Sequence, residues 1–551
     1  MNNILRMHST ALLLITFLLS SASAQDAPVC SREADNVHLT GEALRSVVLT
    51  VGRDPKVFEN DNFSFSRTLS SILATGFVPD LTSGVPVDKQ LQLATSRSEQ
   101  ISLLASMLRT FRNLDRSNGA VRNNASFRPG EAELEAAVLL DPANPRGMRP
   151  IGLFNRLDLA PASWRYCGEH RVVYGMGDGA NRLDRFFLIF EAAVDNPDPG
   201  HSALGCLRIA EFWNSIPQKS ESDRPAALAN FYYKGDLGDG GPPITPVIHN
   251  QHFGLPFGQV RGNLFVTQND PGNNPWMLRE WRTFPTTDKS IAFVADTVKS
   301  NPNPEFYRDN TVLDNPKTGR TQAFIDQGVE FRESFLVSHV RELLEVDLEA
   351  SVDGTTPSKD DVFNRLSALF EDKFNDFESI SQSGDDPGKQ DSAGFKSRIE
   401  REIKKLSLPA GTVITPDQVL TRASALSCAG CHQTAVGREV APGVVWPASN
   451  GFTHIAEAGT LSPTLLDSFL PARCDGMQKF IHDIQGAPPV TVAAPGETEI
   501  AIIRDDYAKI QGSEIQTVLA EGLADLSTNV TEARTQNAKA AGAFRRFRRT
   551  H

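Results

Sequence analysis

The chain has few cysteines and no long apolar run beyond its N-terminal segment. Six cysteines occur in 551 residues, and no later stretch approaches the roughly 18 consecutive apolar residues that a membrane span needs. The sequence also has no glycine-rich phosphate loop and no serine-centred hydrolase elbow. Its net charge of −12 disfavours nucleic acid as a partner. We therefore expect no transmembrane segment in the mature chain and no binding of nucleic acid.

The first 24 residues have the composition of a secretory signal peptide. Arg6 precedes the apolar run ALLLITFLL, and the small residues SASA precede Gln25. A basic start, a short apolar core and small residues before the cleavage point are the three parts of such a signal. We expect cleavage near Ala24 and export to the periplasm or the extracellular space.

Four cysteines stand alone in the sequence and are candidates for disulfides. Exported proteins meet oxidising conditions, in which isolated cysteines tend to pair. Cys167 and Cys206 fall in one strand-rich region, so we expect them to pair with each other. Cys30 and Cys474 would then form the second pair. Four cysteines allow three connectivities, and the spacing alone does not select one of them.

The pattern of apolar residues changes twice along the chain. Helical periodicity, as in QISLLASMLRTFRNL, gives way to short runs rich in aromatic and β-branched residues, as in HRVVYGM and RFFLIFEAAV, and later returns. This predicts an α+β protein with a helical N-terminal part, a strand-rich middle and a mostly helical C-terminal part. The predicted regions are a signal peptide at 1–24, a helical region at 25–147, a strand-rich domain at 148–320, a helical region with mobile loops at 321–410, a compact segment around a cysteine motif at 411–485, and a linker with an amphipathic helix and a basic tail at 486–551.

The cysteine motif is the segment LSCAGCHQTA at 426–435, which holds two cysteines and a histidine. A zinc site is disfavoured, because the remaining cysteines do not supply a second ligand pair of similar spacing. Upstream, Thr415 and Gln418 can form a capping box around Pro416. This predicts a helix that begins there and carries Cys428 and Cys431 near its C-terminal end.

CAGCH, from Cys428 to His432, matches the CxxCH attachment motif of c-type cytochromes at every fixed position. Over about 411–485 the chain resembles small members of that family. The resemblance implies a cytochrome c-like haem module with one covalent haem c. Cys428 and Cys431 would form thioethers to the haem vinyl groups, and His432 would be the proximal iron ligand. With one such motif in the chain, it implies an exported monohaem protein that transfers electrons to an unidentified redox partner.

The second axial ligand would decide what the haem does. The candidates after the motif are His454, Met477 and His482. We favour His454, which lies in a short apolar segment, because core packing is the more common role of a lone methionine such as Met477. The second ring nitrogen of the proximal histidine would need a carbonyl partner. Pro442 and Pro447 lie at positions that could supply one.

Two other functions are compatible with the same motif. An open or displaceable distal position would give a haem-dependent oxidoreductase acting on peroxide or an organic substrate. Alternatively, Cys428 and Cys431 could form a local disulfide in a secreted binding or structural protein. Over about 63–454 the chain resembles secreted bacterial proteins of unknown function, which contain a CxGCH-like segment followed by Phe-x-His. That resemblance groups His432 and His454 as one constellation.

Other candidate sites carry weaker signals. His249 and His252 could hold a metal ion, but their glycine- and asparagine-rich surroundings and the ligand count argue against it. Glu169 and His170 could act as acid and base, although a structural role for this histidine beside a strand is favoured. Four further polar residues are expected to form a buried network or to line a cleft: Asn155, Arg156, Asp158 and Arg171.

Overall fold

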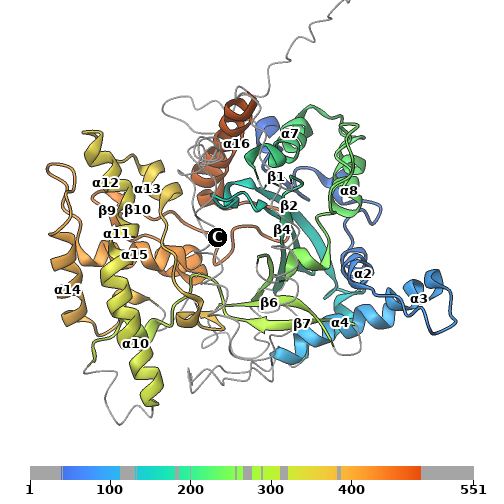
Figure 1. Cartoon of the computed structure of the whole chain (residues 1–551), viewed down its shortest axis with the longest axis horizontal. Helices are drawn as coiled ribbons and strands as arrows, with labels where there is room; N and C mark the ends of the chain where they lie inside the picture. The colour runs from blue at the N-terminus through green and yellow to red at the C-terminus, as the bar shows by residue number, and fades with distance from the viewer. Residues whose placement is uncertain are drawn as a thin grey trace, which may run out of the picture.

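A computed structural model of the chain shows an eight-stranded antiparallel sheet with helices on both faces (Figure 1). It describes residues 39 and 41–485, except 112–130, 132, 180–184, 199, 201, 255–256, 265–275, 287–289, 311–319 and 381–385. A separate two-stranded sheet is formed by β9 (Glu439–Ala441) and β10 (Val444–Val445). The α+β architecture predicted from the sequence, with its strand-rich middle, is confirmed. The predicted signal peptide, Cys30, the C-terminal amphipathic helix and the basic tail lie outside the described residues.

The strands follow one another in the sheet in chain order, and all the pairs are antiparallel. Their sequences are rich in β-branched and aromatic residues, which suit a pleated surface packed on both faces. A short eighth strand from the C-terminal half pairs with β6. The strands are β1 (Val48–Thr50), β2 (Met148–Arg156), β3 (Tyr166–Met176), β4 (Phe186–Asp195), β5 (Gln259–Leu264), β6 (Met277–Pro285), β7 (Ile291–Asp296) and β8 (Ser379–Ile380).

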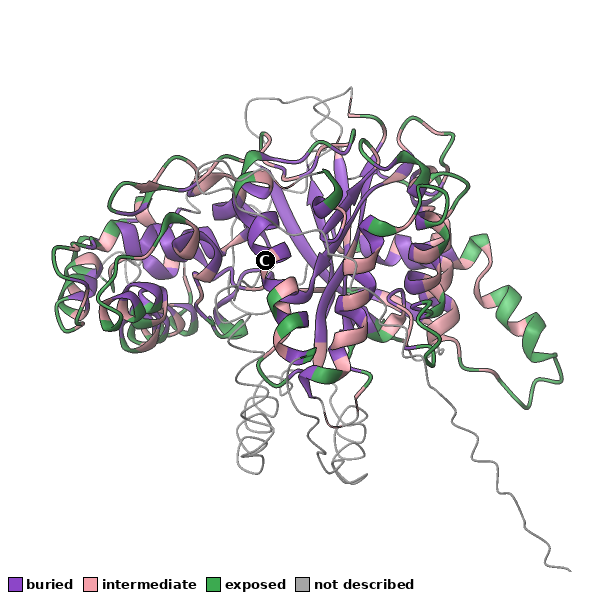
Figure 2. Ribbon diagram, turned by 90° about the horizontal axis from the view of Figure 1, so that it is seen from above, coloured by how far each residue is buried: buried purple, intermediate pink, exposed green. Residues whose placement is uncertain are grey.

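Alternate residues of each strand enter two separate apolar cores, because successive side chains of a strand point to opposite faces. On β3, Val172 and Tyr174 belong to the first core, whereas Val173 belongs to the second. Figure 2 shows these strands as a largely buried layer. Helices that contribute to the first core are α2 (Phe65–Gly76), α4 (Arg97–Thr110), α6 (Ala136–Leu139), α7 (Leu207–Ser215), α8 (Arg224–Lys234) and α16 (Leu470–Gln485).

The second core is built mainly by the C-terminal half of the chain, which covers the other face of the sheet (Figure 1). It contains Phe324 and Phe331 of α10, and α15 is buried from Gln418 to Leu426. The segment 411–485 therefore packs into both cores, with α15 in the second and the end of α16 in the first. The helices are α1 (Gly41–Leu44), α10 (Gln322–Ser334), α11 (Val340–Leu343), α12 (Glu345–Val352), α13 (Lys359–Arg365), α14 (Ala393–Ile403) and α15 (Pro416–Leu426); α3 (Val87–Ala94) has no buried residue.

A disulfide joins Cys167 on β3 to Cys206 just before α7, as the sequence led us to expect. Cys474 on α16 is also disulfide-bonded. Its predicted partner, Cys30, is outside the described residues. Within the described ranges, every helix is too short or too polar to cross a lipid bilayer.

Candidate functional site

The cysteine motif lines a cavity between the sheet and the C-terminal half of the chain. The cavity has about 910 Å³ of empty space, part of it open to solvent. One wall is a face of the sheet, with residues from β2 to β6, and the opposite wall runs from the motif to the start of α16. Its central residues are Phe154, Arg156, Arg171, Val173, Phe187, Ile189, Glu191, Arg261, Asn263 and Leu278 from the sheet, and Cys428, Cys431, His432, His454, Phe469 and Arg473 from the opposite wall.

The predicted capping box is present, but the helix that it starts ends before the cysteines. Thr415 and Gln418 cap each other, with Pro416 in the first turn, and α15 ends at Leu426. Ser427 is extended, and its hydroxyl accepts a hydrogen bond from the Gly430 N–H (3.0 Å), which starts a second, short helical turn. The prediction that one helix carries both cysteines was therefore wrong.

Gly430 explains why the motif can make this sharp break. A Cβ atom at this position would lie 1.7 Å from the Ser424 carbonyl oxygen, so only glycine allows the close approach. The residues from 430 onward form one π-helical turn, Gly430–Thr434. This turn places Cys431 and His432 against the cavity.

His432 is held in the tautomer that a metal ligand needs. Its Nδ1 donates to the Phe452 carbonyl oxygen at 2.8 Å, which leaves Nε2 as the ligating nitrogen. The indole of Trp276 stacks on the imidazole, with 4.7 Å between ring centroids. Burial lowers the pKa of His432 to about 4, against an opposing effect of the Phe452 hydrogen bond, so the ring is neutral. The carbonyl partner is thus Phe452, and the expectation of Pro442 or Pro447 was wrong.

His454 lies beside His432, as the sequence-based grouping proposed. The two imidazole centroids are 4.5 Å apart. Nε2 of His454 lies 3.3 Å from Sγ of Cys431, and Nδ1 lies 2.9 Å from Oγ of Ser462. The loop is closed by pairing of Ile455 with Leu461.

A glycine fixes that loop on the sheet. Gly459 has a φ of 78°, a region that side chains other than glycine seldom adopt. It also packs against Gly52 just after β1, where a Cβ on Gly459 would come within 2.6 Å of the Gly52 nitrogen. The position of His454 is therefore set by contacts of the backbone itself.

Cys428 and Cys431 are both thiols in the structure, rather than a local disulfide. Each has about 4% of its surface exposed, within the wall of the cavity. Burial raises the pKa of Cys428 to about 12, although the Arg261 guanidinium acts in the opposite direction. Cys428 is thus a neutral thiol, whereas Cys431 has an imidazole nitrogen beside it.

Met477 and His482 do not line this cavity. Met477 is buried on α16 in the first core, where its Sδ accepts a hydrogen bond from Nδ2 of Asn155 at 3.2 Å. The side chain of His482 is 89% exposed and lies beside Asp483. Among the candidates for a second axial ligand, only His454 lies at the motif.

The sheet wall of the cavity is rich in arginine. Arg156 forms an ion pair with Asp158 at 2.9 Å, and Arg473 lies 3.8 Å from the same carboxylate. Arg171 pairs with Glu169 and Glu191. Of the four polar residues singled out in the sequence, Arg156 and Arg171 line the cavity and Asp158 pairs with Arg156. Asn155 instead donates to the Ser46 carbonyl oxygen and to Met477.

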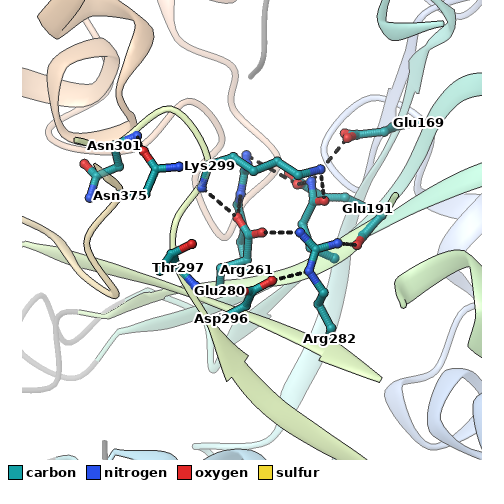
Figure 3. A network of polar contacts seen from close by, with 12 residues as sticks. Glu169, Glu191, Arg261, Glu280, Arg282, Asp296, Thr297, Lys299, Asn301 and Asn375 are labelled. Atoms are coloured by element: carbon teal, nitrogen blue, oxygen red, sulfur yellow. Dashed lines mark hydrogen bonds and ion pairs between the residues drawn. The ribbon is translucent and has the colours of Figure 1, made fainter. Parts of the chain in front are cut away.

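The network continues beyond the cavity across β5, β6 and β7 (Figure 3). Arg261 bridges Glu191 at 3.3 Å and Glu280 at 3.0 Å. Arg282 then pairs with both Glu280 and Asp296. Buried arginines need such partners, because an unpaired buried charge is costly.

Several polar atoms around the cavity lack a hydrogen-bond partner among the described residues. They include Nη2 of Arg261, Oδ1 of Asn263 and Nε1 of Trp276, all of them buried. Buried polar groups are normally satisfied. A molecule bound in the cavity could supply partners for these atoms.

The other candidate sites are structural. His170 is fully buried; its Nδ1 accepts from the Trp213 indole and its Nε2 donates to the Cys167 carbonyl oxygen. His252 is buried with its Nδ1 at the Val247 carbonyl, and His249 caps a short turn. No group of three or more potential metal-ligating side chains is found in the part of the chain that the structure describes.

Sequence reasoning missed Trp276, Phe452 and the polar residues of β5. The strand QVRGNL alternates polar and apolar residues at Gln259, Arg261 and Asn263, a period-two signal that could have shown a polar face. The contacts of Trp276 and Phe452 depend on tertiary structure and leave no such signal. Comparisons of this chain with protein-family models, curated proteins and solved structures gave no match.

Proposed function

We propose that this chain is an exported monohaem c-type cytochrome that transfers electrons to a redox partner. The observation that carries the proposal is the meeting of Cys428, Cys431, His432 and His454 at one cavity. The motif alone would allow these side chains to face apart. Two thiols for covalent attachment and two imidazoles for axial ligation instead lie together.

The donor set fits a haem iron. His432 has its Nδ1 occupied by a carbonyl, so that its Nε2 can ligate metal. His432 and His454 would together hold the iron. When bound, the haem would supply a one-electron redox couple, and ligation by two histidines usually gives a lower potential than ligation by histidine and methionine.

The walls of the cavity fit the rest of the cofactor. Phe154, Val173, Ile189 and Phe469 offer apolar surface for a macrocycle. Arginine pairs strongly with carboxylates. The arginines of the cavity, with the unsatisfied Nη2 of Arg261 among them, would hold the propionates.

Covalent haem is the first test of this proposal. The chain is expressed with its N-terminal segment in cells that carry a c-type maturation system. A haem stain of a denaturing gel and a pyridine haemochrome spectrum are then recorded. We expect one covalent haem per chain, and its complete loss in the Cys428→Ala/Cys431→Ala variant.

His454→Ala tests the axial ligand, with the exposed His482→Ala as the matched control. We expect the haem that the His454→Ala protein carries to lose the low-spin spectrum, and His482→Ala to match the parent. Folded, exported parent protein without haem would overturn the proposal. A parent protein with an open, high-spin iron would support the oxidoreductase alternative instead.

A further inference from the structure

We propose that, before haem is attached, His454 acts as the catalytic base that accepts the thiol proton of Cys431, so that the sulfur can add to a haem vinyl group. The inference rests on the proposed function, which requires thioether formation at this motif. It assigns to this chain a part in its own cofactor attachment, and it predicts that the two cysteines react unequally.

The geometry is that of an activated thiol. A nucleophile and its base lie within hydrogen-bond reach, and a third group orients the base. Here Sγ of Cys431 lies 3.3 Å from Nε2 of His454, and Oγ of Ser462 lies 2.9 Å from Nδ1. A distance of 3.3 Å suits a hydrogen bond that involves sulfur, which is a larger atom than oxygen.

Ser462 is itself fixed, so that it can orient the imidazole. Its side chain is buried, and its Oγ accepts from the Leu465 N–H at 3.3 Å. Its backbone N–H donates to the His454 carbonyl at 2.9 Å. With the ring proton on Nδ1 toward Ser462, Nε2 of His454 is the acceptor for the thiol proton.

Among the residues that the structure describes, no histidine is recorded at hydrogen-bond distance from Cys428. It lies in a small apolar cluster with Trp276, Leu278 and Ala429. Burial of its thiol disfavours the thiolate form, which is the nucleophile. The two cysteines of one motif therefore differ in the group that could accept their proton.

The step is an addition, so it needs no oxidant or reductant. The Cys431 S–H bond breaks, and its proton passes to Nε2 of His454. The sulfur forms a C–S bond to one vinyl carbon, the C=C bond becomes a single bond, and the proton is returned to the other vinyl carbon. All atoms of the thiol and the vinyl group are retained in the product.

The same step would release His454 for its second role. Once Cys431 carries a thioether, it has no proton to donate to the imidazole. Nε2 of His454 is then available to the iron. One histidine would thus serve attachment first and ligation afterwards.

The experiment follows attachment in two single-cysteine proteins. Cys428→Ser leaves Cys431, and Cys431→Ser leaves Cys428; each is made with and without His454→Gln. The full chain is purified free of haem from cells without a maturation system and incubated anaerobically with ferrous protoporphyrin IX. Intact mass under denaturing conditions gives the rate of covalent attachment.

We expect His454→Gln to slow attachment at Cys431 by about a hundredfold, the low end of general acid–base effects. At Cys428 the same substitution should change the rate by less than twofold. Equal slowing at both cysteines would overturn the inference, because His454 would then only hold the haem. No slowing at either would also overturn it. His482→Gln is the matched control, since this side chain is exposed.

A second measurement needs no variant. In the haem-free parent, alkylation by iodoacetamide should modify Cys431 faster than Cys428, as read by peptide mass mapping, and equal rates would contradict the inference. The two proposals fail separately. A parent protein that never acquires haem overturns the proposed function, whereas a parent that does so without dependence on His454 overturns only this inference.

Discussion

The chain holds two clusters in which a histidine lies beside cysteines, one around His170 and one around His432. In the first, Cys167 is bonded to Cys206, and both ring nitrogens of the histidine have protein partners. In the second, both cysteines are thiols, and the histidine uses one nitrogen for a carbonyl. The two clusters contain the same residue types. They differ in the sulfur and nitrogen atoms that can still bond to a further molecule.

The difference shows how a site can be told from a structural cluster. The first cluster lies wholly in the first apolar core, with His170 and Trp213 buried. The second lines a cavity whose polar wall has atoms without partners. Unused hydrogen-bonding capacity beside open space is what distinguishes the second cluster from the first, and it is the reason we propose a function for the second.

The largest effect on stability should come from removing the disulfide of the first cluster, the one around His170. The cysteines are 39 residues apart in sequence, so the bridge restricts the unfolded chain and its loss should cost about 4 kcal/mol. We expect Cys167→Ala/Cys206→Ala to lower the urea midpoint strongly. Covalent haem per folded molecule should be unchanged. A loss of haem without a loss of stability would contradict the assignment of a structural role to the first cluster and of haem binding to the second.

A smaller loss should follow from removing the buried histidine. His170→Ala leaves the Trp213 indole and the Cys167 carbonyl without partners, which should cost about 2 kcal/mol in the free energy of unfolding. The exposed His482→Ala serves as the control, with a change close to zero. Urea unfolding followed by tryptophan fluorescence measures both. Equal stability of the two variants would show that His170 is not structural.

The pH dependence of stability should carry the smallest signal. Burial lowers the pKa of His170 to about 3 in the folded chain, against about 6.5 for an unfolded histidine. Between these values the unfolded state binds a proton that the folded state excludes. This contribution to stability is complete above about pH 6.5 and is lost as the pH falls toward 3.

The variant His170→Phe should therefore have a shallower acid slope. The difference from the parent should approach about 1.4 kcal/mol per pH unit, the value for one proton. Urea midpoints between about pH 7 and pH 5 give this slope. His482→Phe should keep the slope of the parent, and an unchanged slope in His170→Phe would contradict a neutral buried imidazole.

The sequence predicted the elements better than their contacts. Runs such as RFFLIFEAAV fix strands through local preferences, and the capping box at Thr415 and Gln418 fixes the start of α15. The end of that helix depends on the close approach of Gly430 to the Ser424 carbonyl oxygen. The spacing of residues in the sequence did not reveal this contact. Local chemistry is visible in a sequence, whereas a close approach between backbones is not.

The candidate site divides in the same way. His454 could be grouped with the motif from its local segment, but the Phe452 carbonyl at His432 could not, since any residue has a carbonyl. The arginine wall comes from strands more than 150 residues earlier in the chain, joined to the motif only by folding. Side-chain chemistry could thus be predicted, and backbone partners and distant walls could not.

The spread of the cavity walls along the chain has a consequence for the timing of assembly. Their residues run from Phe154 to Arg473. A chain that emerges N-terminus first presents the sheet wall early, but the opposite wall arrives only near the end. A nascent or truncated chain therefore lacks one wall of the cavity. The haem proposed for this site would be enclosed only after most of the polypeptide has been delivered, so the presence of haem would report that the chain is complete.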